Sequence, residues 1–282
     1  MPGPRGTLYL VGTPIGNLED ITLRAMRVLS EVDVIAAEDT RVTRRLLQRH
    51  DIATPVLSYH QHSRERRVTQ LVTMLREGKN VALVSDAGMP GVSDPGAHLV
   101  SACAEAGVPV AVVPGPTAVS SALALCGLPT GEFVFLGFLP ARPAARRKLL
   151  ARVARQPAAI VCFEAPHRLR ESLDDLVGAL GDRPAICGRE LTKKFEQVVR
   201  GRLSDLVAHF SENEPRGELT LVIAGAPIRE GEADLAEAIQ EARDLIESGL
   251  SASRAVSHVA RRRGVARREL YRAVVRTEEE KA

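Results

Sequence analysis

Residues 81–96 are the stretch that most limits the folds open to this chain. Their sequence, VALVSDAGMPGVSDPG, begins with four apolar residues, which is typical of a short buried parallel strand. Small residues, three glycines and the carboxylates of Asp86 and Asp94 follow, and we expect a helix from Pro95 to Gly107. A strand that leads through a glycine-rich loop into a helix is where an open α/β sheet binds its ligand.

The composition of this loop limits the class of ligand. It lacks both glycine motifs that commonly hold phosphates, and no Lys or Arg occurs between Asn80 and Ser101. A polyphosphate would therefore meet two carboxylates with no neutralising cation, whereas hydroxyls, amide donors or a positive charge would suit them. Both aspartates could instead cap helices. We expect that simpler role for Asp94 and contact with a ligand for Asp86.

Residues 7–127 repeat the same alternation of strand and helix. We expect buried strands at residues 7–11, 81–84 and 108–113, a further strand at 33–36 and a short one at 55–59. Helices should lie between them, with Asp20 and Thr40 as N-caps for helices 21–32 and 40–50. This order predicts a parallel sheet with right-handed crossovers. The loops 12–17, 85–94 and 114–118 should then open on one edge, where Thr117 could either cap a helix or contact a ligand.

The second half has a different pattern, which predicts further domains. Longer apolar runs at 133–140, 158–163 and 217–224 favour a mixed sheet, and the turn-rich stretch 126–131 is a plausible joint. Helical spacing follows Pro227, and residues 251–282 contain nine Lys or Arg against four Glu. That basic tail could be a helix-turn-helix, or equally a capping or dimer-forming element. We therefore expect α/β domains at 1–127 and 128–228, with a helical tail at 229–282.

Composition excludes several other classes of protein. A formal charge of +3 on 282 residues does not by itself require a nucleic-acid partner. The four cysteines are far apart, which is typical of buried thiols in a reducing compartment. No segment has the length and apolarity of a signal peptide or membrane span, so we expect a cytoplasmic protein. His60 and His62 have no nearby third ligand, and no metal site is expected.

Three charged clusters, each after an expected strand, carry the remaining candidate chemistry. They are Glu38–Arg41, Glu164–Arg168 and Arg189–Lys194. Each combines a possible base with cations that could hold phosphates, although ion pairing at a domain seam is the alternative. Because Pro166 and Gly188 predict exposed turns, we favour function. The residues alone thus indicate a two-domain α/β enzyme with a cofactor that lacks phosphate and with an anionic substrate.

Six short motifs then point to a known family. They occur in the order 12–17 (GTPIGN), 37–41 (AEDTR), 85–96 (SDAGMPGVSDPG), 114–118 (PGPTA), 164–168 (EAPHR) and 189–193 (RELTK). Together they resemble the tetrapyrrole methylase-like (class III) S-adenosylmethionine-dependent methyltransferases, in the branch that methylates ribosomal RNA. The resemblance implies methyl transfer to a cytidine ribose 2′-hydroxyl in the decoding region of 16S rRNA, within the small ribosomal subunit. It also implies a homodimer, with the cofactor in a cleft between two α/β domains.

The same resemblance assigns expected roles to individual residues. S-adenosylmethionine has a sulfonium, an ammonium and hydroxyls but no phosphate, in agreement with the acidic loop. The expected cofactor contacts are Pro14, Ile15, Ser85, Asp86, Gly88, Met89, Ser93, Thr117, Ala118, Phe163, Leu191 and Glu218. The candidates for assisting deprotonation of the ribose hydroxyl are Glu38, Asp39, Glu164 and Lys193. The expected substrate contacts are Arg41, His167, Arg168 and Lys194.

Two other functions compete with this interpretation. A tetrapyrrole or other small-molecule methyltransferase of the same superfamily would share the acidic loop, but it would not need the arginine-rich clusters. A non-catalytic RNA-binding module would account for those clusters, but it would not need the cofactor loop.

Overall fold

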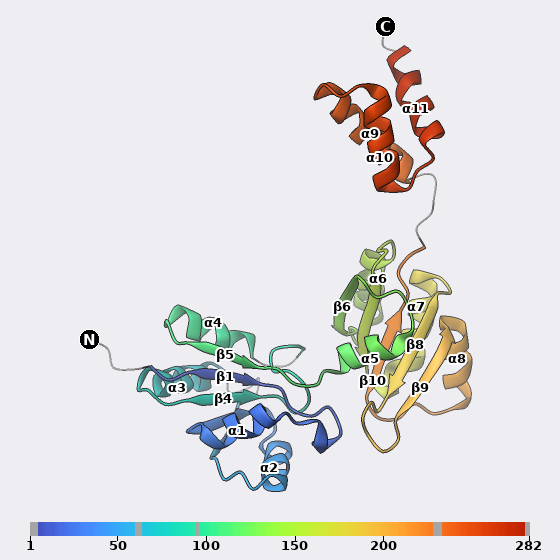
Figure 1. The fold of residues 1–282 in the computed structure, drawn as a ribbon. Helices are drawn as coiled ribbons and strands as arrows, with labels where there is room; N and C mark the ends of the chain where they lie inside the picture. Colours follow the sequence, from blue (N-terminus) through green and yellow to red (C-terminus); the bar gives the residue numbers. More distant parts are fainter. Residues whose placement is uncertain (1–4, 60–63, 94–95, 228–232, 280–282) are drawn as a thin grey trace. The chain divides into compact units, whose positions relative to one another are not determined.

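The computed structural model describes residues 5–59, 64–93, 96–227 and 233–279 (Figure 1). The chain divides into two compact units, residues 1–226 and 227–282, and each is described by itself. The expected cap at Asp94 and the histidines His60 and His62 lie outside the described residues.

The first unit begins with a five-stranded parallel sheet of order β3-β2-β4-β1-β5. Its strands are β1 (Leu8–Val11), β2 (Val34–Ala37), β3 (Val56–Ser58), β4 (Val81–Val84) and β5 (Val110–Val113). Its helices are α1 (Leu23–Glu31), α2 (Thr40–Arg49), α3 (Arg64–Arg76) and α4 (Ala97–Glu105), with a short turn η1 (Leu18–Asp20). The predicted parallel α/β arrangement is confirmed. Since β4, β1 and β5 are neighbours, their following loops open on one edge as expected.

Helices cover both faces of this sheet (Figure 1). One core joins α1 and α2 to the strands through Val28, Leu29 and Leu47, and the other joins α3 and α4 through Leu75 and Leu99. Strands β2 and β4 are buried along their whole length, because they lie inside the sheet and under both helical layers.

Two predicted helix caps are wrong, each by a shift toward a better-placed side chain. Asp20 ends η1, and Thr22 caps α1 instead, with its Oγ1 accepting a hydrogen bond of 3.0 Å from Ala25 N. Asp39 rather than Thr40 caps α2, since its Oδ1 accepts from Arg41 N at 2.8 Å. In both cases the cap is the oxygen that reaches a free amide of the first turn.

The strand predicted at residues 108–113 is confirmed as β5, but its expected burial is wrong for two of its residues. Strand β5 is an edge strand, and Val110 and Val112 are 38% and 57% exposed. An apolar run indicates a strand, but it does not distinguish an edge from the centre of a sheet.

The second sheet of the first unit is mixed, as predicted, with strand order β6-β7-β10-β8-β9. Its strands are β6 (Phe133–Phe138), β7 (Ala159–Glu164), β8 (Pro184–Arg189), β9 (Gln197–Arg202) and β10 (Leu219–Ile223). Only the β6–β7 pair is parallel among the described pairings. Strand β9 was not predicted, because its sequence QVVRGR contains only two apolar residues and gives a weak apolar signal. Gly188, expected in an exposed turn, lies buried within β8.

Helices also cover both faces of this second sheet. On one face lie α6 (Pro143–Val153), α7 (Leu169–Leu180), which follows the short turn η3 (Pro166–Arg168), and α8 (Leu203–Glu212). On the other face, α5 (Ala118–Cys126) packs through Ala122 and Cys126 on Val161 and Val222, and the core there includes Ile15. Helix α5 therefore leaves the first sheet's edge loop and packs on the second sheet. The four cysteines are buried and unbridged, as predicted, and burial raises the pKa of Cys187 to about 12.

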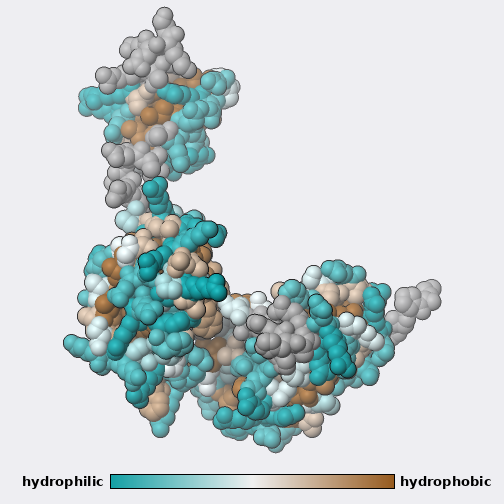
Figure 2. All heavy atoms as spheres, turned by 180° about the vertical axis from the view of Figure 1, so that it is seen from behind, coloured by the Kyte–Doolittle hydropathy of each residue, from teal (hydrophilic) through white to brown (hydrophobic). Residues whose placement is uncertain are grey.

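The second unit consists of the helices α9 (Ala233–Glu247), α10 (Ala252–Arg263) and α11 (Arg267–Glu279). They share a small core of Ala238, Ala242, Val256, Val259 and Leu270. Figure 2 shows hydrophobic residues between hydrophilic ones on the surface of this unit. No helix in the described ranges is long and apolar enough to cross a membrane.

The cap of α1 gives a direct stability test. Thr22→Ala should lower the free energy of unfolding by about 1 kcal/mol, because it removes the acceptor for Ala25 N. Asp20→Ala is the matched control, since Asp20 Oδ2 is buried without a hydrogen-bond partner among the described atoms and should lose nothing comparable. Urea denaturation of both variants measures this. A larger loss of unfolding free energy in Asp20→Ala than in Thr22→Ala would show that Asp20 caps α1 after all.

Candidate functional site

Backbone contacts hold the three small-residue loops together at the carboxyl edge of the first sheet. Thr13 and Gly88 exchange hydrogen bonds of 2.9 and 3.1 Å, and Gly12 N donates to Val113 O at 3.0 Å. A side chain at residue 12 would place its Cβ only 2.7 Å from Gly115 N. Glycine is therefore required where the loops after β1 and β5 approach each other. The three loops pack together at this edge of the sheet.

A cavity of about 430 Å³, here called the acidic cavity, adjoins these loops. Its volume lies in the usual range for a small-molecule site. Four of its lining residues carry carboxylates, Glu38, Asp86, Glu164 and Glu218, and none of the described residues that line it is Lys, Arg or His. Phe138 and Phe163 add an aromatic wall, with ring centroids 5.4 Å apart. The cavity suits a ligand with positive charge, hydrogen-bond donors and an apolar ring.

A second cavity of about 440 Å³, here called the cationic cavity, shares Ile15, Asp86, Ala87 and Glu218 with the first. It differs in charge, since Arg45 of α2 and Lys193 of the β8–β9 loop line it and offset the shared carboxylates of Asp86 and Glu218; it is named for these two cations, which the acidic cavity lacks. The shared residues make the two cavities neighbours. One ligand that favours carboxylates and another that favours cations could therefore meet at this boundary.

Large apolar side chains exposed to solvent gather at both cavities. Val92 and Phe138 at the acidic cavity are 47% and 57% exposed, and Leu18 and Val42 at the cationic cavity are 40% and 43% exposed. Exposed apolar side chains that line a cavity are typical of surfaces that a ligand covers.

Asp86 is fixed at the boundary of the two cavities. Its Oδ1 accepts a hydrogen bond of 2.9 Å from Asp39 N, which couples the loop after β4 to the start of α2. The carboxylate of Asp39 is itself occupied by Arg41, with N···O distances of 3.1 and 2.6 Å. Its hydrogen bonds to the Arg41 side chain and backbone lower the pKa of Asp39 to about 2. A carboxylate of such low pKa is a weak proton acceptor near neutral pH.

Lys193 is held between two carboxylates at the edge of the cationic cavity. Its Nζ lies 3.0 Å from Glu190 Oε1 and 3.1 Å from Glu218 Oε1. Partial burial lowers the pKa of Lys193, but the hydrogen bonds and charges of Glu190 and Glu218 outweigh burial, and the pKa lies above its ordinary value. Lys193 is therefore an ammonium group near neutral pH and contributes positive charge to the cavity.

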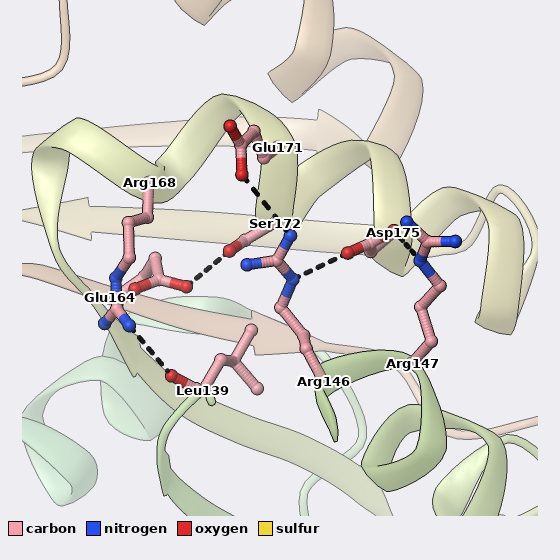
Figure 3. Close-up of polar contacts among 8 residues, drawn as sticks. All are labelled: Leu139, Arg146, Arg147, Glu164, Arg168, Glu171, Ser172 and Asp175. Carbon is pink, nitrogen blue, oxygen red and sulfur yellow. Dashed lines mark hydrogen bonds and ion pairs between the residues drawn. The ribbon is translucent and has the colours of Figure 1, made fainter. Parts of the chain in front are cut away.

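Glu164 lies in a buried polar network between β7 and α7 (Figure 3). One carboxylate oxygen is 2.6 Å from Arg168 Nη2 and accepts from Ala165 N at 2.7 Å, while the other accepts from Ser172 Oγ. Arg168 also donates to Leu139 O at 3.3 Å. Both oxygens of Glu164 are thus occupied by the protein. These contacts suit a structural role for Glu164, which holds β7 and α7 in place beside the acidic cavity.

The expected site residues fall into three groups. Those that line the acidic cavity are Ile15, Glu38, Asp86, Gly88, Met89, Ser93, Thr117, Ala118, Phe163, Glu164 and Glu218. Those that line the cationic cavity, besides the shared residues, are Pro14, Ser85 and Lys193. Those that line neither of these two cavities are Asp39, Arg41, His167, Arg168, Leu191 and Lys194.

Several of these residues have other partners. Leu191 is buried in the core formed with α5, and Ser85 Oγ donates to its own loop at Ala87 O and Gly88 O. His167 and Lys194 are exposed. Thr117 combines both roles weighed for it, since it caps α5 through Ser120 N at 3.1 Å and lines the acidic cavity.

Sequence reasoning missed two sets of lining residues. Val42 and Leu46 lie on one face of α2 and line the cationic cavity beside Arg45. Their i, i+4 spacing was a usable signal. Phe138, Leu219 and Thr220 line the acidic cavity from the second sheet. The second sheet's approach to the first cannot be deduced from local patterns.

Fold and cavities together define a two-sheet α/β protein with two adjoining ligand cavities of different charge. The family model of the tetrapyrrole (corrin/porphyrin) methylases matches residues 7–207. Ribosomal RNA small subunit methyltransferase I of Synechocystis sp. is 48% identical over 268 residues, which are 94% of this chain and 96% of that protein. The chain belongs to the tetrapyrrole methylase family and is a methyltransferase.

Two further matches add detail. Ribosomal RNA small subunit methyltransferase I of Thermotoga maritima is 47% identical over 220 residues, which are 78% of this chain and 99% of that protein. Among solved structures, uroporphyrin-III-C-methyltransferase from Thermus thermophilus superposes with a TM-score of 0.56 at 26% identity. That match covers 77% of this chain and 94% of the solved chain, which supports the two-sheet fold.

The ion pairs of Lys193 give a second stability test. Lys193→Met should lower the free energy of unfolding by about 1–3 kcal/mol near neutral pH, because it leaves the half-buried Glu190 without its cation. Lys193→Arg should keep most of the wild-type free energy of unfolding, because it retains a cation beside Glu190. The folded pKa of Lys193 is raised and that of Glu190 is lowered. The difference between Lys193→Met and wild type should therefore vanish as pH falls through the folded pKa of Glu190 and as pH rises through that of Lys193. Urea denaturation at several pH values tests this, and a constant difference would contradict it.

Proposed function

We propose that this chain transfers a methyl group from S-adenosylmethionine to the ribose 2′-hydroxyl of a cytidine in the decoding region of 16S rRNA. The observation that carries the proposal is the contact between an acidic cavity and a cationic cavity through Asp86 and Glu218. A cationic cofactor and an anionic polymer need opposite charges within one site. The names of the Synechocystis and Thermotoga relatives supply the RNA class.

The acidic cavity suits S-adenosylmethionine by its donor set. Carboxylates of Asp86 and Glu218 favour hydroxyl, ammonium and sulfonium groups, and the aromatic wall at Phe138 and Phe163 favours an adenine ring. When bound, the cofactor supplies an electrophilic methyl group. The carboxylate of Asp86 keeps a fixed position in the cavity wall, because its Oδ1 accepts a hydrogen bond from Asp39 N.

The cationic cavity suits the RNA strand. We assign Lys193 and Arg45 to phosphate contact, since both line the cavity and Lys193 is held in its charged form. Leu18 and Val42 offer apolar surface for a base or ribose. These residues orient the 2′-hydroxyl, and correct alignment is the main part of such catalysis.

The proton released by the hydroxyl needs an acceptor as the new O–C bond forms and the C–S bond breaks. Among the four candidates, Asp39 has a low pKa, Glu164 is occupied by Arg168 and Ser172, and Lys193 is an ammonium. We propose Glu38 as the acceptor on its position: it lines the acidic cavity and directly precedes Asp39, whose N binds Asp86.

A methyl-transfer assay tests this proposal. The substrate is small ribosomal subunits from a strain that lacks the modification, with labelled S-adenosylmethionine. Wild type should label one cytidine, whose linkage then resists alkali. Glu38→Gln should lower kcat by about 10²–10⁴-fold with cofactor affinity retained, as expected for loss of a base. Asp86→Ala should abolish cofactor binding while the fold is kept.

Three outcomes would contradict the proposal in different ways. Methylation of a base rather than a ribose would reject the reaction. Transfer to a tetrapyrrole and not to the subunits would favour the small-molecule alternative. Cofactor binding by Asp86→Ala equal to that of wild type would reject the assignment of the acidic cavity.

We also propose that the protein acts in the cytoplasm, where the proposed ribosomal substrate lies, and that it forms a homodimer. The exposed Val110 and Val112 leave an apolar face on the edge strand β5, which a second copy could cover. Val112→Lys should shift the protein toward monomer in light scattering after size exclusion. The matched control, Leu23→Lys, changes an apolar residue that is 82% exposed on α1 and should leave the mass unchanged. A dimer that persists in Val112→Lys would exclude this edge.

A further inference from the structure

The helical unit 233–279 contains two groups of arginines, one paired with carboxylates and one exposed to solvent. Two arginines at the end of α10 are neutralised by α9. Arg263 lies 2.8 Å from Glu237 and 2.6 Å from Glu241, and Arg262 also pairs with Glu241. Hydrogen bonds from Arg263 and Arg262 lower the pKa of Glu241, in agreement with a fixed ion pair. These pairs join α9 to α10 and account for two of the cations.

Five other arginines on α10 and α11 are exposed and take part in none of the ion pairs found among the described residues. They are Arg254, Arg261, Arg267, Arg268 and Arg272. We call this set the arginine face. Arg254 and Arg261 lie seven residues apart, two helical turns, on the side of α10 away from the buried Val256 and Val259.

Hydrogen bonding connects the two helices within this face. Arg267 Nη2 donates to Ser253 Oγ at 3.3 Å, which brings the start of α11 to the start of α10, beside Arg254. Tyr271, one turn further along α11, is 43% exposed. An aromatic ring among arginines is a common combination in surfaces that bind RNA, because bases stack on rings while guanidinium groups bind phosphates.

The fold of the unit does not require the arginine face. Its core is aliphatic, and its ion pairs use Arg262 and Arg263. Like charges near one another repel, so an external anion would stabilise the arrangement. Residues 251–279 contain arginines but no lysine. Arginine is the residue that binds phosphate oxygens with two parallel hydrogen bonds.

The length of the Thermotoga relative bears on the role of this unit. That protein is covered to 99% of its length by a match that leaves about a fifth of this chain without a counterpart. The family model ends at residue 207, before the helical unit begins. A protein with the name of an rRNA methyltransferase can therefore be shorter than this chain by about the length of the helical unit. This favours an auxiliary role for the unit.

We propose that the arginine face of α10 and α11 binds the phosphate backbone of the RNA substrate and raises affinity without taking part in methyl transfer. This inference rests on the proposed function. Its partner is a polyanionic RNA, since the face combines several cations with an exposed aromatic ring. Because the unit is covalently joined to the catalytic unit, each phosphate that it binds adds to the affinity of the whole chain.

Kinetics on full-length protein test the inference. In Arg254→Gln/Arg261→Gln, KM for small ribosomal subunits should rise about 10-fold or more, while kcat and the affinity for S-adenosylmethionine stay unchanged. The slope of log affinity against log salt should become shallower by about 0.7–0.9 for each phosphate that the variant no longer binds. Neither residue bonds within the core, so the variant should keep the wild-type circular dichroism. The matched control is Arg66→Gln/Arg76→Gln, which removes two exposed arginines from α3 and should leave KM unchanged.

The outcomes separate this inference from the proposed function. If wild type methylates ribosomal subunits and Arg254→Gln/Arg261→Gln has the same KM and salt slope, the arginine face does not bind RNA. If the variant instead loses self-association or binding to an acidic protein with KM unchanged, the face belongs to a protein partner and the inference is overturned. If wild type transfers no methyl group to RNA, the proposed function itself fails and the inference with it.

Discussion

The close approach of the loops after β1, β4 and β5 is the feature on which the site depends. Gly12 packs on Gly115 without room for a side chain, and Thr13 pairs with Gly88 through two backbone hydrogen bonds. Backbone amides and carbonyls that would otherwise face the cavity are thereby satisfied within the protein. The carboxylate of Asp86 is then supported by Asp39 N. These contacts hold in place the loops whose side chains line both cavities.

Charge is divided between the cavities by the way each ionised group is paired. Arg41 neutralises Asp39 and Arg168 neutralises Glu164, so these four groups contribute little net charge near the ligand. Lys193 is likewise paired, with Glu190 and Glu218, whereas Arg45 lines the cationic cavity and takes part in no ion pair found among the described residues. Several charged residues of the sequence motifs form ion pairs, so fewer of them are candidates for catalysis than the motifs indicate. The partner of each group decides whether it can accept a proton, bind an anion or only position its neighbours.

Much of this could be predicted from the sequence, and the limits have physical causes. Parallel strands place their carboxyl ends together, so the meeting of the loops at Gly12, Asp86 and Gly115 followed from the strand order. Side-chain pairing depends on tertiary contacts, and the burial of Glu164 under α7 could not be inferred from the motif 164–168. The turn expected at Gly188 failed for the same reason. A glycine marks local freedom, but the sheet decided its conformation.

The packing of α5 explains why the second sheet takes part in the site. Its N-terminal cap Thr117 lies at the edge loop of the first sheet, while Ala122 and Cys126 pack on the second. One helix therefore connects the wall of the acidic cavity to the strands that carry Phe163 and Leu219. A change in the core under α5 would move Thr117 relative to Asp86. The apolar contacts of α5, far from any charged group, thus set the geometry on which the polar site relies.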